Sequence, residues 1–342
     1  MSQVLVTGGS GFISGHIIIR LLEDGHRVRT TLRSLGKEES VRGILRAHGV
    51  TDGQNERLSF VAADLTNDAG WAEAISGVDY VLHVASPVHI GKVADEADVI
   101  GPARAGTLRV LRAAVDASVK RVVLTSAFHA VGFGHRPHRE FTEADWSPVL
   151  GPGMDAYGRS KVMAEKAAWD FMKAHGGATE LTTMLPVAVM GPMMGPDISG
   201  SNHLIQQMLT GKMPVLANIY LPIVDVRDVA TAHVAAMTAE SAAGERILVA
   251  TGEPAVALKD VSGILREELG EVARKVPTRK LPDAVVKAVG LVSKDFRTAT
   301  ADLGYQKRVS VKKLNEVLGV YPRSEREAIV AAGRSMVENG AA

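Results

Sequence analysis

Cysteine is absent from all 342 residues of the sequence. This absence excludes disulfide bonds, zinc sites built on thiolates and a cysteine nucleophile. No apolar run approaches the roughly 18 residues that a membrane-spanning helix needs. A strand-like segment begins within the first few residues, so we expect no signal peptide. Together these features predict a cytoplasmic protein without a membrane segment.

Charge of one sign is also lacking, because 39 Lys and Arg residues balance 38 Asp and Glu residues and leave a net charge of +1. This balance provides no bulk field for nucleic acid or an anionic membrane. Aromatic residues make up only 4% of the chain, so some of the 12 methionines must fill core positions. The two histidines of the HRPH run, His135 and His138, are too few and lack acidic partners, so we expect no metal site.

The N-terminal stretch Met1–Glu23 contains the clearest motif. The apolar run Val4–Val6 is typical of a buried parallel strand, and apolar residues recur at helical spacing from Phe12 to Leu22. A glycine turn between them would bring the backbone and the helix N-terminus close to a pyrophosphate. The small residue Ser14 occupies the third position of the motif. The residues expected to contact a dinucleotide here are Gly8, Ser10, Gly11, Phe12 and Ile13.

Strand-like and helical segments then alternate, which predicts an α/β fold with a doubly wound parallel sheet. At the end of the second strand, Arg33 and Lys37 stand where an acid would favour NAD, so we expect NADP(H). Small residues that end the fourth strand leave room for the nicotinamide ribose. The further strands are expected at Arg27–Leu32, Leu58–Ala62, Val78–Val84, Arg121–Leu124 and Leu181–Leu185, and the small residues are Val84, Ala85 and Ser86.

A tyrosine and a lysine four residues apart, Tyr157 and Lys161, open the helix after the fifth strand. Residues at this spacing lie on one helix face. The lysine ammonium is expected to lower the pKa of Tyr157, which then exchanges a proton with a substrate oxygen. Lys161 is also suited to hold the nicotinamide ribose.

The motifs TGGSGFI, HVASPV, YGRSK, DVRDVA and YPRS occur along most of the chain. Their order resembles the extended short-chain dehydrogenase/reductase superfamily, in particular its dihydroflavonol-reductase-like carbonyl and aldehyde reductases. The resemblance implies a Rossmann-type fold with a smaller C-terminal substrate-binding lobe, and NADPH-dependent reduction of a ketone or aldehyde. It also implies a homodimer formed by helices four and five. The predicted dinucleotide-binding domain spans residues 1–190 and is rejoined by about 222–250, and the predicted lobe spans 191–221 and 251–342.

The resemblance implies further roles for single residues. Asp64, followed by Leu65, would meet the adenine amine, and Pro186 with Val187 would lie beside the nicotinamide. The family's catalytic serine at the end of the fifth strand is replaced by Ala127. The preceding Ser126 faces the other way in a straight strand, so it serves as the donor to the substrate only if the strand end bends. Thr125 and His129 are alternative donors; we favour Ser126.

The expected pocket residues are Ala127, Phe128, His129, Met190 and Tyr220. Several methionines, among them Met190, follow the sixth predicted strand. They favour either an adaptable apolar pocket or plain core filling. Two other functions stay open at this stage. A nucleotide-sugar epimerase or dehydratase would share the Tyr–Lys pair, and a non-catalytic NADP(H)-sensing protein would explain Ala127.

Overall fold

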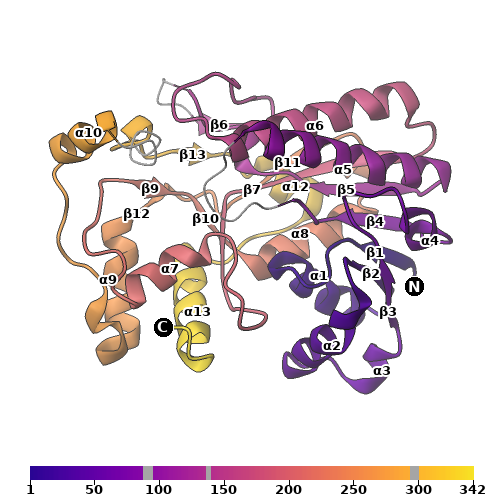
Figure 1. The fold of residues 1–342 in the computed structure, drawn as a ribbon, viewed down its shortest axis with the longest axis horizontal. Helices are drawn as coiled ribbons and strands as arrows, with labels where there is room; N and C mark the ends of the chain where they lie inside the picture. The colour runs from indigo at the N-terminus through magenta and orange to yellow at the C-terminus, as the bar shows by residue number, and fades with distance from the viewer. Residues whose placement is uncertain (88–94, 136–139, 293–299) are drawn as a thin grey trace.

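Seven parallel strands form the central sheet of the computed structural model, which describes residues 1–87, 95–135, 140–292 and 300–342. The strand order is β11-β7-β5-β4-β1-β2-β3, as Figure 1 shows on the side of the molecule that carries the N-terminus. This is the predicted doubly wound sheet of Rossmann type. The strands are β1 (Gln3–Val6), β2 (Arg27–Leu32), β3 (Leu58–Ala62), β4 (Tyr80–His83), β5 (Arg121–Thr125), β7 (Glu180–Pro186) and β11 (Arg246–Val249).

The strand order reverses between β1 and β4, both of which pair with parallel neighbours. Ligands of such sheets bind at the carboxyl ends of the strands beside this reversal. Every residue of β5 is buried, as its continuous apolar run predicts for a strand covered on both faces. The predicted bounds of β2 and β3 match the structure, whereas β4 is shorter than predicted and β7 is longer by one residue at each end.

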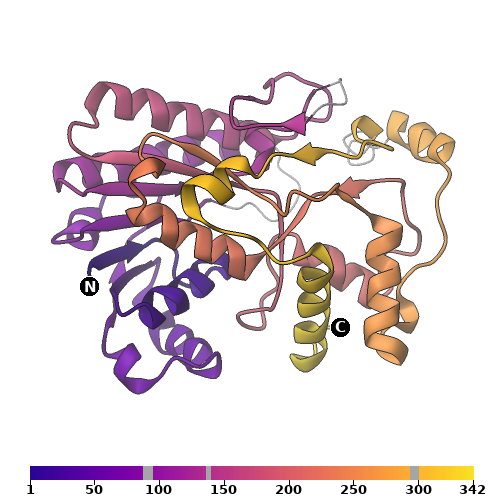
Figure 2. The same ribbon diagram turned by 180° about the vertical axis from the view of Figure 1, so that it is seen from behind.

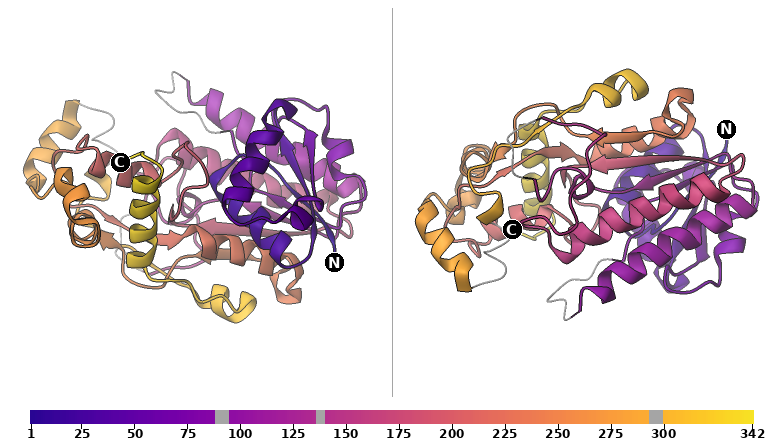
Figure 3. Two further views of the ribbon diagram at one scale, coloured as in Figure 1. Left: turned by 90° about the horizontal axis from the view of Figure 1, so that it is seen from below. Right: turned by 90° about the horizontal axis from the view of Figure 1, so that it is seen from above.

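Helices cover both faces of the sheet. α1, α2 and α8 contribute buried residues to the core on one face, and α4, α5 and α6 contribute to the core on the other. α5 and α6 run side by side along the second face, as the view from above in Figure 3 shows. The helices of this part are α1 (Phe12–Glu23), α2 (Glu38–Ala47), α3 (Asp52–Asn55), α4 (Trp71–Ile75), α5 (Ala97–Asp116), α6 (Ala156–His175) and α8 (Val226–Thr238).

A second lobe lies beyond the carboxyl ends of the strands and has a core of its own. Its helices pack around short strand pairs, of which β8–β10 is parallel and β9–β12 is antiparallel. Its elements include α7 (Asn202–Leu209), α9 (Leu258–Leu269), α10 (Asp283–Val292), α13 (Glu325–Glu338), β8 (Ala188–Met190), β9 (Tyr220–Leu221), β10 (Ile223–Asp225) and β12 (Val256–Ala257).

The C-terminal segment crosses back to the sheet before it reaches α13, as the gold ribbon in Figure 2 shows. β13 (Arg308–Val309) pairs with β6 (Glu140–Phe141), and α12 (Lys312–Leu318) packs against β11 and α8. Tyr305 belongs to the same core as Val4 and Ile17. The boundaries of the two predicted domains stay a prediction.

The helices of the four described ranges include none that is both long and apolar enough to cross a membrane.

Candidate functional site

The glycine turn and the start of α1 form a cradle at the carboxyl end of β1. Gly8 has a φ of +75°, in the left-handed region that glycine tolerates best. A Cβ atom at Gly8 would approach the Ala85 Cβ to 3.0 Å, so the turn lies tightly against the end of β4. No side chain caps α1, and uncapped first-turn amides of a helix are suited to bind an anion.

The side chain of Ser14 stabilises the glycine turn. It is buried, and its hydroxyl donates a hydrogen bond to the Gly8 carbonyl at 2.5 Å. A Cβ atom at Gly11 would lie 2.8 Å from this hydroxyl, which explains why Gly11 has no side chain. The small third residue thus fits the turn, as the sequence analysis expected of a serine.

Of the cradle glycines Gly8, Gly9 and Gly11, Gly9 would place an added Cβ atom closest to a neighbouring side chain. Its replacement by alanine is therefore expected to lower the free energy of unfolding. The added Cβ would lie 2.3 Å from the Thr30 Oγ1, and Thr30 is fully buried and bonded to the Val6 carbonyl. Overpacking of this kind costs roughly 1–3 kcal/mol. Urea unfolding of Gly9→Ala measures the loss. Gly43→Ala on α2, where a Cβ meets nothing within 4 Å, is the matched control and should keep or raise stability.

The end of β2 presents two exposed cations, Arg33 and Lys37. No ion pair within the described ranges includes either side chain. Asp64 stands across from them after β3 and accepts hydrogen bonds from the Thr66 amide and hydroxyl, both at 2.8 Å. These bonds, with a contribution from the Arg33 charge, lower the pKa of Asp64. Asp64 therefore forms a local turn, and the structure leaves its predicted contact with adenine untested.

Tyr157 and Lys161 lie in the first turns of α6, whose N-cap is Asp155. The Asp155 Oδ1 accepts from the Gly158 amide at 2.7 Å, which fixes where the helix begins. The Lys161 side chain is buried and reaches toward the β5 end, with its Nζ 3.5 Å from the Thr125 carbonyl oxygen and 5.8 Å from the centre of the Tyr157 ring.

The pKa of Tyr157 differs from the one expected from the sequence. Desolvation by the surrounding protein, and next the Asp155 carboxylate, raise the pKa of Tyr157 to about 12, although 38% of the residue is exposed. Burial lowers the pKa of Lys161 to about 8, against the opposing effect of the Glu165 carboxylate. The predicted lowering of the Tyr157 pKa is therefore not found. The phenol keeps its proton at neutral pH, as a proton donor must.

The hydroxyls at the end of β5 point to opposite faces of the sheet, as strand alternation requires. The Ser126 Oγ donates to the Glu165 Oε2 at 2.6 Å, on the α6 side. On the α8 side, the Thr125 Oγ1 lies 2.8 Å from the His233 Nε2. The His233 Nδ1 faces the Val229 carbonyl at 2.7 Å and must donate to it, so Nε2 accepts and Thr125 donates. Both hydroxyls thus have protein acceptors, and the preference for Ser126 as the substrate donor finds no support in this geometry.

His129 lies beside the tyrosine. It is part of a short 3-10 turn after β5, stacks on Phe133 at a centroid distance of 4.0 Å, and meets the Tyr157 ring edge-on at 5.0 Å. Burial lowers the pKa of His129 to about 4, so its ring is neutral at pH 7. The buried Lys307 lies over the Phe133 ring, with its Nζ 3.9 Å from the ring centre.

The structure brings most of the other predicted residues to the same edge of the sheet. Ala85 and Ser86 follow β4, and Ala127 and Phe128 follow β5 as buried residues. Met190 is fully buried in the core of the second lobe, which favours core filling over an open methionine pocket. The remaining predicted residues at this edge are Leu65 after β3, Val84 after β4, and Pro186 and Val187 at the end of β7, whereas Tyr220 lies in β9 of the second lobe.

His138 falls outside the described residues, and so does Val88 of the HVASPV run. The His135 Nε2 bonds to the Val131 carbonyl at 2.9 Å. The residues that the structure describes contain no cluster of three side chains that is suited to a metal ion.

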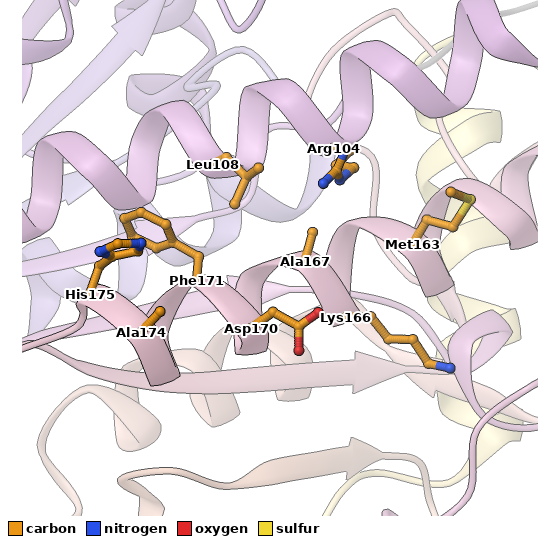
Figure 4. A pocket seen from close by; sticks show the side chains of 9 residues that line it. All are labelled: Arg104, Leu108, Met163, Lys166, Ala167, Asp170, Phe171, Ala174 and His175. Atoms are coloured by element: carbon orange, nitrogen blue, oxygen red, sulfur yellow. The ribbon is translucent and has the colours of Figure 1, made fainter.

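A cavity of about 500 Å³ lies away from this chemistry. It is a groove between α5 and α6, lined by Arg104 and Leu108 from α5 and by residues of α6 such as Phe171 (Figure 4). A small cavity of about 20 Å³ adjoins the Tyr–Lys pair and is lined by Lys161, Ser126 and Glu165, among others.

Sequence reasoning missed Asp155, His233 and Glu165. Asp155 carries a readable signal, an N-cap acid just before a helix start. Glu165 follows Lys161 by one helical turn, but three of its hydrogen-bond partners lie on or directly after strands that are far from it in the sequence.

Comparisons with known proteins show the family of this chain. The model of the NAD dependent epimerase/dehydratase family matches residues 4–250, and the chain belongs to this family. Cinnamoyl-CoA reductase 1 of Arabidopsis thaliana is 37% identical over 251 residues, which cover 72% of this chain and 69% of that protein. The ketoreductase azaE of Aspergillus niger is 31% identical over 330 residues, covering 88% and 96%.

Solved structures extend the similarity over nearly the whole chain. The yeast methylglyoxal/isovaleraldehyde reductase Gre2, solved with NADPH, has a TM-score of 0.80 and 26% identity, covering 99% of this chain and all of that one. Vestitone reductase from alfalfa has a TM-score of 0.76 and 25% identity. The predicted resemblance to extended short-chain reductases is confirmed.

Proposed function

We propose that the chain is an NADPH-dependent reductase that converts a ketone or aldehyde to an alcohol. The observation that carries the proposal is the placement of Tyr157 and Lys161 at the carboxyl end of β5, the same edge of the sheet as the glycine cradle. The cradle fits a pyrophosphate, since its helix N-terminus is uncapped and its glycines leave the backbone open. NADPH oxidation with a panel of aryl ketones and aldehydes tests the proposal directly.

NADPH, when bound, supplies the hydride to the carbonyl carbon. Tyr157 gives its phenolic proton to the developing alkoxide, and its high pKa keeps that proton available at neutral pH. Lys161 holds the ribose hydroxyls and contributes positive charge beside the tyrosine. The burial of Lys161 strengthens this interaction because the local dielectric constant is low.

The second hydrogen bond to the substrate oxygen comes from His129. Thr125 and Ser126 donate to protein acceptors, whereas the imidazole of His129 lies edge-on against Tyr157. A neutral imidazole has one N–H and donates without an added proton. Stacking on Phe133 fixes the plane of the ring. Ala127 and Phe128 then form the adjoining pocket wall, with Tyr220 from the second lobe.

NADPH should be used better than NADH, because Arg33 and Lys37 suit a 2′-phosphate. Arg33→Asp should weaken NADPH binding roughly tenfold or more, since a charge-assisted contact to phosphate is lost and a like charge is added. Steady-state KM values for both cofactors measure the change. Arg46→Asp makes the same change of net charge on the outer part of α2 and should leave the preference intact. Equal use of NADH and NADPH by the wild type contradicts the assignment.

The family model also covers epimerases and dehydratases, which keep their cofactor bound through the reaction. A cofactor that copurifies and resists dilution would favour that function over reduction. A chain that binds NADPH but oxidises it with no carbonyl would favour the sensing function instead.

The proposal extends to assembly and location. The fourth and fifth strands are followed by α5 and α6, and the groove between these helices lies on the outer face of the molecule, which supports the homodimer that the family resemblance implies. A cytoplasmic location agrees with the absence of cysteine.

A further inference from the structure

Glu165 is a buried ionisable group close to the Tyr–Lys pair. It lies on α6 one turn beyond Lys161 and is only 1% exposed. Its Oε2 accepts from the Ser126 hydroxyl at 2.6 Å, and its Oε1 accepts from the Thr183 hydroxyl at 3.0 Å and from the Arg246 Nε at 2.7 Å. A buried carboxylate is stable only with such partners.

These three donors lie on or directly after three adjacent strands, and a fourth, the Trp169 Nε1, lies on α6 itself, 3.4 Å from the Glu165 Oε1. Ser126 follows β5, Thr183 belongs to β7 and Arg246 begins β11. Arg246 is itself held in place, because it donates to the Asp145 carbonyl at 2.8 Å and its guanidinium lies 3.7 Å from the centre of the Trp146 ring. These bonds fix α6 along its axis and about its axis at a point one turn from Lys161.

Lys161 faces few other charged groups. It shares the small cavity with Glu165 and Ser126, and within the described ranges its Nζ makes one long hydrogen bond, to the Thr125 carbonyl at 3.5 Å. The other titratable groups whose charges act on it or that adjoin it are Tyr157 on α6, His83 on β4 and His129 after β5. Burial lowers the pKa of His83 to about 3 and that of His129 to about 4, so both are neutral above pH 6.

We propose that Glu165 is a positioning residue that places Lys161 at the β5 end and keeps its ammonium charged, and that Ser126 serves the reaction by anchoring Glu165. The proposal rests on the reductase function above. It assigns Ser126 an indirect role, through a hydrogen bond that is already made without substrate.

The direction of the electrostatic effect follows from charge. Burial lowers the pKa of Lys161 to about 8, and the Glu165 carboxylate opposes that shift. Removal of the negative charge should therefore lower the pKa of Lys161 further, and Lys161 should lose its proton at a lower pH. The positive charge of Arg246, on β11, offsets part of the effect of the Glu165 carboxylate on Lys161. Arg246 lies on the other side of that carboxylate from Lys161, so the offset is partial.

Glu165→Gln tests this inference by its pH profile. The alkaline limb of kcat/KM should move to lower pH by about one unit or more, while kcat at pH 6 stays within a few-fold of the wild type. Thr183→Val is the matched control: it removes one hydrogen bond to Glu165 and keeps the charge, so it should lower stability without moving the limb. If the alkaline limb of Glu165→Gln stays at the wild-type pH and only the melting temperature falls, the proposal is overturned.

Two additions keep the test decisive. If Glu165→Gln does not fold, the double variant with Arg246→Gln leaves no unpaired buried charge and should show a shift in the same direction. An NMR titration of the full-length chain, with the Lys161 Cε signal assigned by comparison with Lys161→Arg, measures the pKa of this buried ammonium without turnover. An equal Lys161 pKa in wild type and variant overturns the inference, whereas a wild type inactive with every carbonyl contradicts the proposed function alone.

Discussion

Tyr157→Phe is expected to lower the turnover of carbonyl substrates by a factor on the order of 10² or more, while NADPH binds almost as tightly as before. The substitution keeps the ring that meets His129 edge-on and removes only the proton donor. Because burial raises the pKa of Tyr157 to about 12, the wild-type phenol is protonated throughout the neutral range. Single-turnover NADPH oxidation separates the chemical step from cofactor binding.

Tyr321→Phe is the matched control for this loss of a hydroxyl. Tyr321 is 76% exposed and lies on the segment between α12 and α13, so its substitution should leave turnover unchanged. Reduction at near-wild-type rates by Tyr157→Phe would remove the tyrosine from the mechanism.

His129→Ala should lower kcat by roughly 10² to 10³, the usual effect of losing one preorganised donor to a developing oxyanion. Ala127→Ser tests the same position from the other side, because it restores a hydroxyl in the slot that the reductase family fills with serine. The added hydroxyl should recover much of the activity of His129→Ala. In the wild-type background it should change turnover less, because His129 already donates.

Ser126→Ala distinguishes this arrangement from the one that the sequence analysis favoured. Because the Ser126 hydroxyl donates to Glu165, Ser126→Ala should lower kcat only a few-fold, and the KM for the carbonyl should not change. A fall near 10² in Ser126→Ala, with full activity in His129→Ala, assigns the donor to Ser126 and requires the strand end to bend when substrate binds.

Much of the fold follows from local patterns. The apolar run Val4–Val6 and the glycines after it predict the strand, the turn and α1, and the structure has all three in place. The same holds for Tyr157 and Lys161, since a four-residue spacing on a helix fixes their common face. Strand alternation also anticipates that Ser126 turns away from the face where Ala127 stands.

The electrostatic environment was harder to predict, because it depends on groups far apart in the chain. The sequence shows Lys161 beside Tyr157 but not the burial that raises the tyrosine pKa. It shows Ser126 but not the Glu165 carboxylate that accepts its hydroxyl. The sequence likewise does not reveal whether Met190, in β8, borders a pocket or a core, since apolar side chains line both.

The return of the C-terminal segment to the sheet has a consequence for synthesis on the ribosome. β11, which pairs with β7 along Thr183–Pro186, and α12, which covers β11, both follow residue 245. A nascent chain that has emerged only as far as β8 therefore presents β7 as a bare edge with unpaired amides, which invites pairing with other chains. The sheet of the nucleotide-binding part is therefore complete only after Val249 has been translated, and β11 stays uncovered until α12 follows.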